Sequence, residues 1–214
     1  MRLGLACVDG RAPGEVLQLL RAAGICGAEL DAVEAPALVA AAPVYPRSGG
    51  AHTWLLAPAA DVLSACTRGA LDAGIAGKDE LLELDAGVHE LLELPALRDA
   101  LVYAGLERSS AGGSRRRRRV ATRYPRVARD HFAARGLQAE IVEFSAPVLA
   151  VGLGMADGVV ELRSRLAAAG AGLEERAQIA ACSARLVSSR AARTLAAAAL
   201  EDLIERLRAH GAAP

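Results

Sequence analysis

Residues 119–162 read RVATRYPRVARDHFAARGLQAEIVEFSAPVLAVGLGMADGVVEL, and this stretch decides the fold class. Its pattern predicts strand, helix, strand, helix, strand with few residues between the elements. Pro125 suits the first turn of a helix that Gly136 ends. The apolar runs 139–144 and 158–162 are typical of strands. Strands that alternate with helices at this spacing indicate a mostly parallel sheet covered by helices, and thus an α/β protein.

The same alternation extends outward from this stretch. Further strands are predicted at residues 3–7, 53–57, 72–77, 89–94 and 100–106, with another within 178–188. Helices are predicted at 13–23, at 61–68 with Asp61 as N-cap and Gly69 as C-cap, from Lys78 onward, at 147–153 and at 190–210. The last helix places Leu195, Ala199, Leu203 and Leu207 on one face, which we expect to pack on the first domain.

Composition excludes several classes of protein. The 214 residues contain 25 basic and 25 acidic residues, so no net charge favours nucleic acid or an anionic membrane. No apolar run is long enough to span a bilayer, and the amino terminus lacks the pattern of a signal peptide. The four cysteines form no metal-binding or redox motif, and we expect them to be reduced in a cytoplasmic protein.

Five consecutive arginines, residues 115–119, follow a polar stretch. A solvated loop is the first interpretation of this run, and contact with phosphate or an acidic partner is the second. Aromatic side chains that could stack on bases are absent nearby, which argues against specific nucleic-acid binding. The histidines are scattered, and no spacing marks a metal site or a general base.

Four segments, taken in order, identify a family resemblance. They are VDGRA at 8–12, DAGIAGKDELLE at 72–83, RVATRYPRVARDHFAARG at 119–136 and GLGMADGVVEL at 152–162. In order and spacing the chain resembles the catalytic portion of the ATP phosphoribosyltransferase family. The resemblance implies two α/β domains similar to type II periplasmic binding proteins, with the active-site cleft between them. We expect domain one at 1–92 plus 180–214 and domain two at 93–179.

The resemblance also implies a reaction, the first step of histidine biosynthesis. The family joins N1 of ATP to the ribose C1 of phosphoribosyl pyrophosphate and releases pyrophosphate, with Mg²⁺ bound to the substrate. Positioning and electrostatics supply the catalysis, so no catalytic nucleophile is expected. At this length the chain resembles the short form of the family, which acts as an oligomer with a histidyl-tRNA-synthetase-like regulatory subunit.

Matching positions imply the substrate-binding residues. These are Gly10, Arg11, Gly77, Lys78, Asp79, Thr122, Asp157 and Glu161. Asp157 matches the first aspartate of the family's sugar site and Glu161 replaces the second, so both are expected to hold ribose hydroxyls. Each has a structural alternative: Asp157 as a cap at the strand start, Lys78 as a surface residue and Arg11 as part of an internal salt bridge.

The phosphate loop departs from the family pattern. The family has Thr-Gly-x-Thr after this strand, whereas this chain has Arg163, Ser164 and Arg165 followed by LAAAG. Ser164 offers one hydroxyl and the two arginines offer charge. Without glycine a backbone anion nest is harder to form, and the segment reads as an ordinary helix start.

Two further substitutions lie near the expected site. Asp9 replaces a family lysine, and Val148 replaces a family glutamate. Two hypotheses follow from this mixture of matches and losses. The chain is a divergent phosphoribosyltransferase, or it is a catalytically degenerate paralogue that serves as a ligand-binding or regulatory subunit. A solute-binding protein of the same fold is a third, weaker reading.

Overall fold

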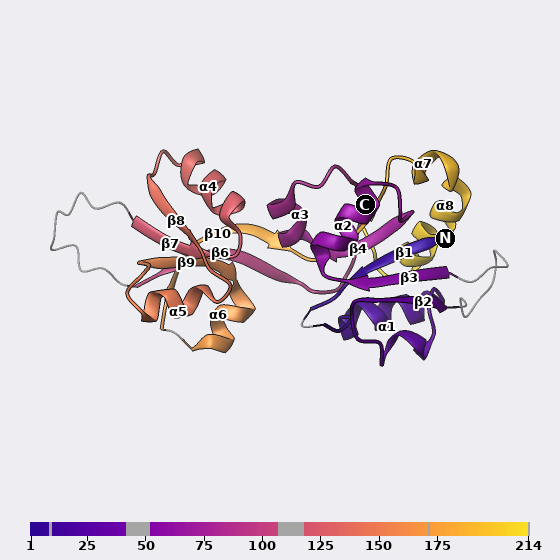
Figure 1. The fold of residues 1–214 in the computed structure, drawn as a ribbon, viewed down its shortest axis with the longest axis horizontal. Helices are drawn as coiled ribbons and strands as arrows, with labels where there is room; N and C mark the ends of the chain where they lie inside the picture. Colours follow the sequence, from indigo (N-terminus) through magenta and orange to yellow (C-terminus); the bar gives the residue numbers. More distant parts are fainter. Residues whose placement is uncertain (9, 42–51, 107–117, 171, 214) are drawn as a thin grey trace. The chain divides into compact units, whose positions relative to one another are not determined.

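The computed structural model describes residues 1–8, 10–41, 52–106, 118–170 and 172–213 (Figure 1). The chain forms two compact units: unit 1 is Met1–Arg98 with Ser183–Pro214, and unit 2 is Asp99–Cys182. The boundaries expected from sequence, after residues 92 and 179, differ from these. Unit 2 begins six residues later and ends three residues later than expected, because its first and last strands pair with each other from Asp99 to Cys182.

Unit 1 contains a six-stranded sheet of order β2-β3-β1-β4-β11-β5. Its strands are β1 (Arg2–Ala6), β2 (Ala37–Ala41), β3 (His52–Ala57), β4 (Ala73–Gly77), β5 (His89–Glu93) and β11 (Ala184–Ser188). Its helices are α1 (Gly14–Ala22), the 3₁₀ turn η1 (Ala28–Leu30), α2 (Ala59–Thr67), α3 (Lys78–Leu84), α7 (Ala192–Leu195) and α8 (Ala197–Ala209). Strand β1 runs parallel to β3 and β4, whereas β2 and β11 are antiparallel to their neighbours.

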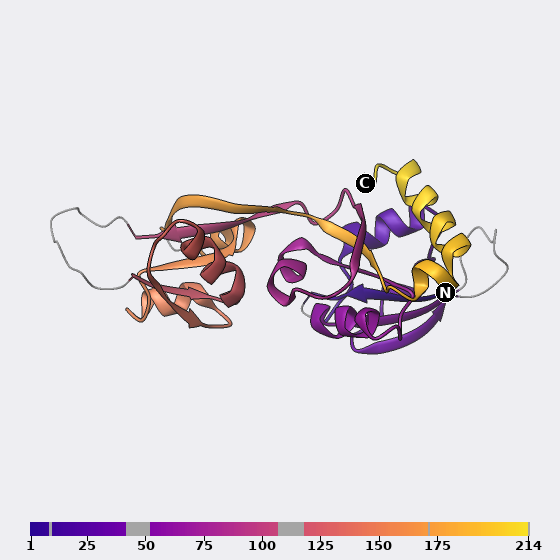
Figure 2. The same ribbon diagram turned by 90° about the horizontal axis from the view of Figure 1, so that it is seen from above.

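Helices cover both faces of this sheet (Figure 2). On one face α1 and α8 bury apolar side chains against alternate residues of the strands, such as Leu3 and Leu5 of β1. On the other face α2 lies very close to the sheet. A Cβ atom at Gly4 would lie 2.7 Å from Val62, and one at Gly74 would lie 2.9 Å from Cys66. Glycine at both positions therefore allows α2 to approach.

The carboxyl-terminal helix packs on unit 1 as predicted, but its buried stripe differs. Leu200, Leu203 and Leu207 join the core, whereas Leu195 is 86% exposed. The chain leaves helical geometry at Ala196, between α7 and α8, so Leu195 falls out of register with the leucines that follow. Across the described residues, no helix has the length and apolar character needed to cross a membrane.

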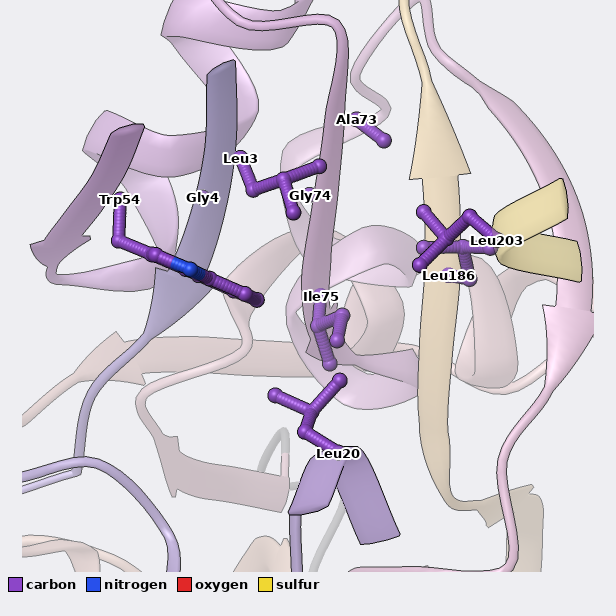
Figure 3. A pocket seen from close by; sticks show the side chains of 9 residues that line it. All are labelled: Leu3, Gly4, Leu20, Trp54, Ala73, Gly74, Ile75, Leu186 and Leu203. Atoms are coloured by element: carbon purple, nitrogen blue, oxygen red, sulfur yellow. The ribbon is translucent and has the colours of Figure 1, made fainter. Parts of the chain in front are cut away.

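A small cavity lies in the core of unit 1, between the sheet and helices α1 and α8 (Figure 3). All of its lining residues are apolar or glycine except Trp54, whose buried indole N–H has no hydrogen-bond partner. Binding sites normally combine an apolar lining with several convergent polar groups. This cavity lacks such a set, so it is a packing defect of the core rather than a substrate site.

Unit 2 contains a five-stranded sheet of order β10-β6-β9-β7-β8. Its strands are β6 (Asp99–Gly105), β7 (Arg118–Thr122), β8 (Ala139–Glu143), β9 (Gly158–Leu162) and β10 (Glu174–Cys182), and its helices are α4 (Pro125–Ala134), α5 (Pro147–Gly152) and α6 (Arg163–Ala169). The strand–helix alternation predicted for residues 119–162 is confirmed. Strand β7 is parallel to β8 and β9, and β6 is antiparallel to β9 and β10.

The two faces of this sheet are covered by different helices (Figure 1). Helix α4 covers one face, where the ring of Phe132 packs edge-on against the ring of Tyr103 with their centroids 5.1 Å apart. Helices α5 and α6 cover the other, over a core that includes Ala104 and Val159. Tyr103 and Ala104 are consecutive residues of β6 and point to opposite faces, as strand geometry requires.

The structure confirms two predicted helix C-termini and corrects one predicted N-cap. Gly69 (φ +72°) and Gly136 (φ +64°) adopt left-handed backbone conformations just after α2 and α4, as predicted for helix C-termini. Asp61, however, is not an N-cap. Helix α2 begins at Ala59, two residues before Asp61, and Pro58 occupies the N-cap position with non-helical backbone. Asp61 therefore lies in the first turn, where its charge is favourable to the helix dipole.

We expect the protein to lose stability as pH falls below about 6.5. Desolvation and the nearby Arg135 lower the pKa of buried His131, and desolvation is also the main cause that lowers the pKa of His52. Near and below pH 6.5, the ordinary histidine pKa, the unfolded chain therefore binds more protons than the folded chain. The free energy of unfolding falls as the pH falls through this range. Melting temperatures at pH 7.5 and 5.5 test this. His131→Gln should reduce the drop, and an unchanged drop would contradict the assignment to His131.

Candidate functional site

Each sheet has one switch point at the carboxyl ends of its parallel strands. In unit 1 it lies between β1 and β4, because the chain runs from β1 to β2 on one side of this point and from β4 to β5 on the other. Ligands of open α/β sheets bind in the crevice at such a point. The segment after β1 carries Gly10 and Arg11, and β4 leads into Gly77, Lys78 and Asp79. The structure thus brings these five predicted residues to one edge.

The turn after β1 presents an exposed cation. Val8 and Arg11 exchange two backbone hydrogen bonds of 2.9 and 3.0 Å, and Gly10 has φ +78°. Arg11 Nη2 lies 3.6 Å from Glu34 Oε1, but the two side chains are 76% and 79% exposed. Such a pair contributes little to stability, so Arg11 is available to a ligand. Asp9, predicted to reverse the charge of this turn, lies outside the described residues.

Lys78 begins α3 and is held in place from two directions. Its backbone N–H donates to Ser183 O at 3.0 Å, and its Nζ lies 2.5 Å from Glu90 Oε1 on β5. The carboxylate of Asp79 lies against Gly77, where a Cβ atom would contact it. The ammonium group is therefore positioned at the edge by Glu90 rather than extended into solvent.

The switch point of unit 2 lies between β7 and β9. The chain leaves β7 through α4 toward β8 on one side, and leaves β9 through α6 toward β10 on the other. Arg123 follows β7 directly, and Arg163, Ser164 and Arg165 follow β9. These three arginines and Ser164 therefore lie at a second edge of the kind that binds ligands.

Glu161 lies near the carboxyl end of β9 and is buried, with 3% of its surface exposed. Its Oε1 accepts the backbone N–H of Leu162 at 2.9 Å. Arg165 Nη1 lies 3.8 Å from Oε1, and Arg123 Nε lies 3.8 Å from Oε2. The carboxylate thus stands between two guanidinium groups. A buried carboxylate is retained only when cations and hydrogen bonds compensate for its desolvation, which these groups do.

Asp157 lies at the opposite end of the same strand. Its Oδ2 accepts the backbone N–H of Arg119 at 2.8 Å, and its own N–H donates to Arg119 O at 2.8 Å. Three residues lie between Asp157 and Glu161, so the two residues are four strand steps, or about 13 Å, apart. The two carboxylates therefore lie near opposite ends of β9. The contacts of Asp157 fit the structural alternative, in which it secures the start of β9.

The segment that replaces the phosphate loop is helical from Arg163, as its sequence predicted. Arg163 donates two hydrogen bonds of 2.8 Å to Glu175 and one of 3.1 Å to Gln178. The hydrogen bonds with Glu175 are the main cause that raises the pKa of Arg163, and they lower the pKa of Glu175. Arg163 is therefore already paired within the protein.

Ser164 is also engaged. Its hydroxyl donates to Asp99 Oδ2 at 2.5 Å, and its N–H lies 3.3 and 3.4 Å from the two oxygens of the same carboxylate. Asp99 thus satisfies the start of α6 with an internal anion. Sequence inspection missed Asp99, because its position depends on the antiparallel pairing of β6 with β9.

Thr122, the last residue of β7, is completely buried. Its hydroxyl donates to Val160 O at 2.7 Å and accepts the N–H of Tyr124 at 2.9 Å. Its hydroxyl is therefore engaged within unit 2. It fixes the path of the chain where β7 ends, and this path places Arg123. Sequence inspection missed Arg123 as well, although it lies within the RVATRYP segment.

Cysteine chemistry is poorly supported in this fold. None of the four cysteines forms a disulfide in the described structure. Burial raises the pKa of Cys66 to about 12 and is the main cause that raises the pKa of Cys26 to about 11. Such thiols stay protonated at neutral pH. Within the described residues no group of three or more histidine, cysteine, aspartate or glutamate side chains is arranged to hold a metal ion.

Comparison with known proteins identifies the family. The model of the family described as "HisG: ATP phosphoribosyltransferase" matches residues 58–209. The chain belongs to the ATP phosphoribosyltransferase family. A relative named ATP phosphoribosyltransferase from Symbiobacterium thermophilum is 32% identical over 213 residues, covering 95% of this chain and 92% of the relative. One of the same name from Acidithiobacillus ferrooxidans is 36% identical, covering 96% and 95%.

Solved structures support the fold of this family member. The ATP phosphoribosyl transferase (HisG:HisZ) complex from Thermotoga maritima aligns with TM-score 0.75 and 20% identity, covering 97% of this chain and 96% of that chain. A periplasmic sulfonate-binding protein, SsuA of Methylobacillus flagellatus, aligns with TM-score 0.64 and 13% identity, covering 97% and 66%. The predicted fold class, two α/β domains resembling periplasmic binding proteins, is confirmed.

Proposed function

We propose that this chain is an ATP phosphoribosyltransferase. It joins N1 of ATP to the ribose C1 of phosphoribosyl pyrophosphate and releases pyrophosphate, the first step of histidine biosynthesis in the cytoplasm. The observation that carries the proposal is the match to enzymes of this name along nearly the whole chain, at 32% and 36% identity. The positions of the predicted residues at two sheet edges are consistent with it.

The two edges suit a reaction between two highly anionic substrates. Arg11 and Lys78 supply positive charge at the edge of unit 1, and Arg123 and Arg165 supply it at the edge of unit 2. Holding both reactants in line and stabilising the departing pyrophosphate would provide most of the rate enhancement. The described residues need not hold Mg²⁺ themselves, because the ion would enter bound to the pyrophosphate group as part of the substrate.

A direct assay tests the proposal. Purified protein is mixed with ATP, phosphoribosyl pyrophosphate and Mg²⁺, and formation of phosphoribosyl-ATP is followed by near-ultraviolet absorbance. The assay is run alone and with a histidyl-tRNA-synthetase-like subunit, since the Thermotoga maritima structure is a HisG:HisZ complex. We propose that this chain also works in such an oligomer. No product under either condition would favour the alternative of a degenerate ligand-binding or regulatory subunit.

One observation favours the alternative of a degenerate subunit. The start of α6, where the family has its phosphate loop, is occupied by the Asp99 carboxylate through Ser164. A phosphate could not take this position without displacing Asp99. An active enzyme would therefore either displace Asp99 or bind the sugar phosphate through other groups of unit 2.

Lys78→Met is expected to lower kcat/KM by about tenfold to a hundredfold, because a cation beside a bound polyphosphate contributes about 1–3 kcal/mol. Glu90→Gln is the matched control. It removes the carboxylate partner of Lys78 but leaves the ammonium charge in place, so it should cost much less. Equal losses in the two variants would show that Lys78 acts only through its ion pair with Glu90.

A further inference from the structure

The arginines that flank Glu161 differ from the other basic residues at this edge. Arg123 and Arg165 come from different segments, after β7 and within α6, yet both approach one buried carboxylate. Their side chains are each 36% exposed, so both remain accessible to solvent from the edge. The two guanidinium groups and one carboxylate leave one positive charge uncompensated among these three groups.

The hydrogen-bonding capacity of this pair is not exhausted. A separation of 3.8 Å is too long for a hydrogen bond, so Glu161 attracts both groups without accepting from these nitrogen atoms. Arg165 Nη1 is buried and makes no hydrogen bond in the described structure. Arg123 uses Nη2 to donate to Ser145 O at 2.8 Å, which fixes the direction of its guanidinium plane.

Arg163 shows the contrast on the same helix. Its donors are taken up by Glu175 and Gln178 at hydrogen-bonding distance. Recruiting Arg163 to a ligand would break this bidentate pair. Arg123 and Arg165 would break no hydrogen bond of this kind with Glu161. They can therefore bind an anion at a lower energetic cost than Arg163 can.

We infer that Arg123 and Arg165 bind a phosphate monoester, and that Glu161 is a positioning residue that holds them together. The guanidinium group is suited to a phosphate because its donors match two phosphate oxygens at once. The inference rests on the proposed function and refines it: this arginine pair replaces the missing phosphate loop. The phosphate belongs either to phosphoribosyl pyrophosphate or to ATP, and the two sources share this chemistry.

Calorimetric titration of the whole chain with ribose 5-phosphate and, separately, with ATP tests the inference without requiring turnover. Arg123→Gln and Arg165→Gln should each weaken binding of one of the two ligands by at least about tenfold. The ligand affected identifies the source of the phosphate. Arg129→Gln, which removes a charge from an exposed position of α4, is the matched control and should leave both affinities within about twofold.

Three results would overturn the inference. They are unchanged affinity for both ligands in the Arg123 and Arg165 variants, a loss found with Arg163→Gln instead, and no binding of either ligand by the unmodified chain. Arg165→Lys adds a readout that a merely structural role would not move: it keeps the charge but loses the two-point geometry, so binding should weaken while the melting temperature stays unchanged. The proposed function fails separately, through absence of phosphoribosyl-ATP in the enzymatic assay.

Discussion

Thr122→Val will destabilise unit 2 by about 2–4 kcal/mol, although the two side chains have nearly the same shape. The threonine hydroxyl is buried and serves both Val160 O and the N–H of Tyr124. Valine removes both hydrogen bonds in a place that water does not reach, and each unmet group costs about 1–3 kcal/mol. Urea unfolding followed by circular dichroism measures the loss.

Thr122→Ser is the control for this prediction, because serine keeps the hydroxyl and loses only a methyl group. It should recover most of the stability that valine loses. Because Thr122 also directs the chain into Arg123, Thr122→Val should weaken binding of the ligand that Arg123 recognises, even where the protein is still folded. Equal stability of the valine and serine variants would show that the hydroxyl is not important.

Gly158→Ala will separate β9 from β6 and cost about 3 kcal/mol. A Cβ atom at Gly158 would lie 2.6 Å from the backbone oxygen of Ala104 and 3.0 Å from the ring of Tyr103. Backbone in the middle of a sheet cannot move aside as a flexible side chain can. The strand that carries Glu161 would therefore be displaced, and the melting temperature of unit 2 should fall.

Gly152→Ala provides the comparison within the same unit. Gly152 is the last residue of α5, and a Cβ atom there would meet nothing within 4 Å. Alanine in a helix is usually more stable than glycine by about 0.5–1 kcal/mol. Trp54 is the only tryptophan of the chain and lies in unit 1, so its fluorescence can verify that unit 1 stays folded in both variants. A Gly158→Ala protein as stable as the Gly152→Ala protein would contradict the predicted clash.

Much of unit 2 could be predicted from sequence because its signals are local. Pro125 and Gly136 mark the ends of α4, and the apolar runs of β8 and β9 lie between short turns. The same local reasoning failed at Leu195. A single departure from helical geometry at Ala196 moves Leu195 off the apolar face that it was expected to share with the later leucines. A helix break without proline or glycine leaves no mark that periodicity can detect.

The candidate site was predicted from the family motifs rather than from local signals. Arg11, Lys78 and Glu161 lie at matching positions of those motifs, and Arg165 lies in the segment that replaces the phosphate loop. Asp99 lies outside the motifs and reaches Ser164 from the amino end of an antiparallel strand.

The pairing of Asp99 with Cys182 makes unit 2 a continuous insertion whose two ends are neighbours. Ala96 and Ala184, just outside it, are hydrogen-bonded to each other at 2.8 Å. A short flexible linker could therefore close the parent domain after excision, and the excised module could be grafted between homologues. Modular exchange of this kind offers a route by which one half of the molecule can diversify while the other keeps its ancestral architecture.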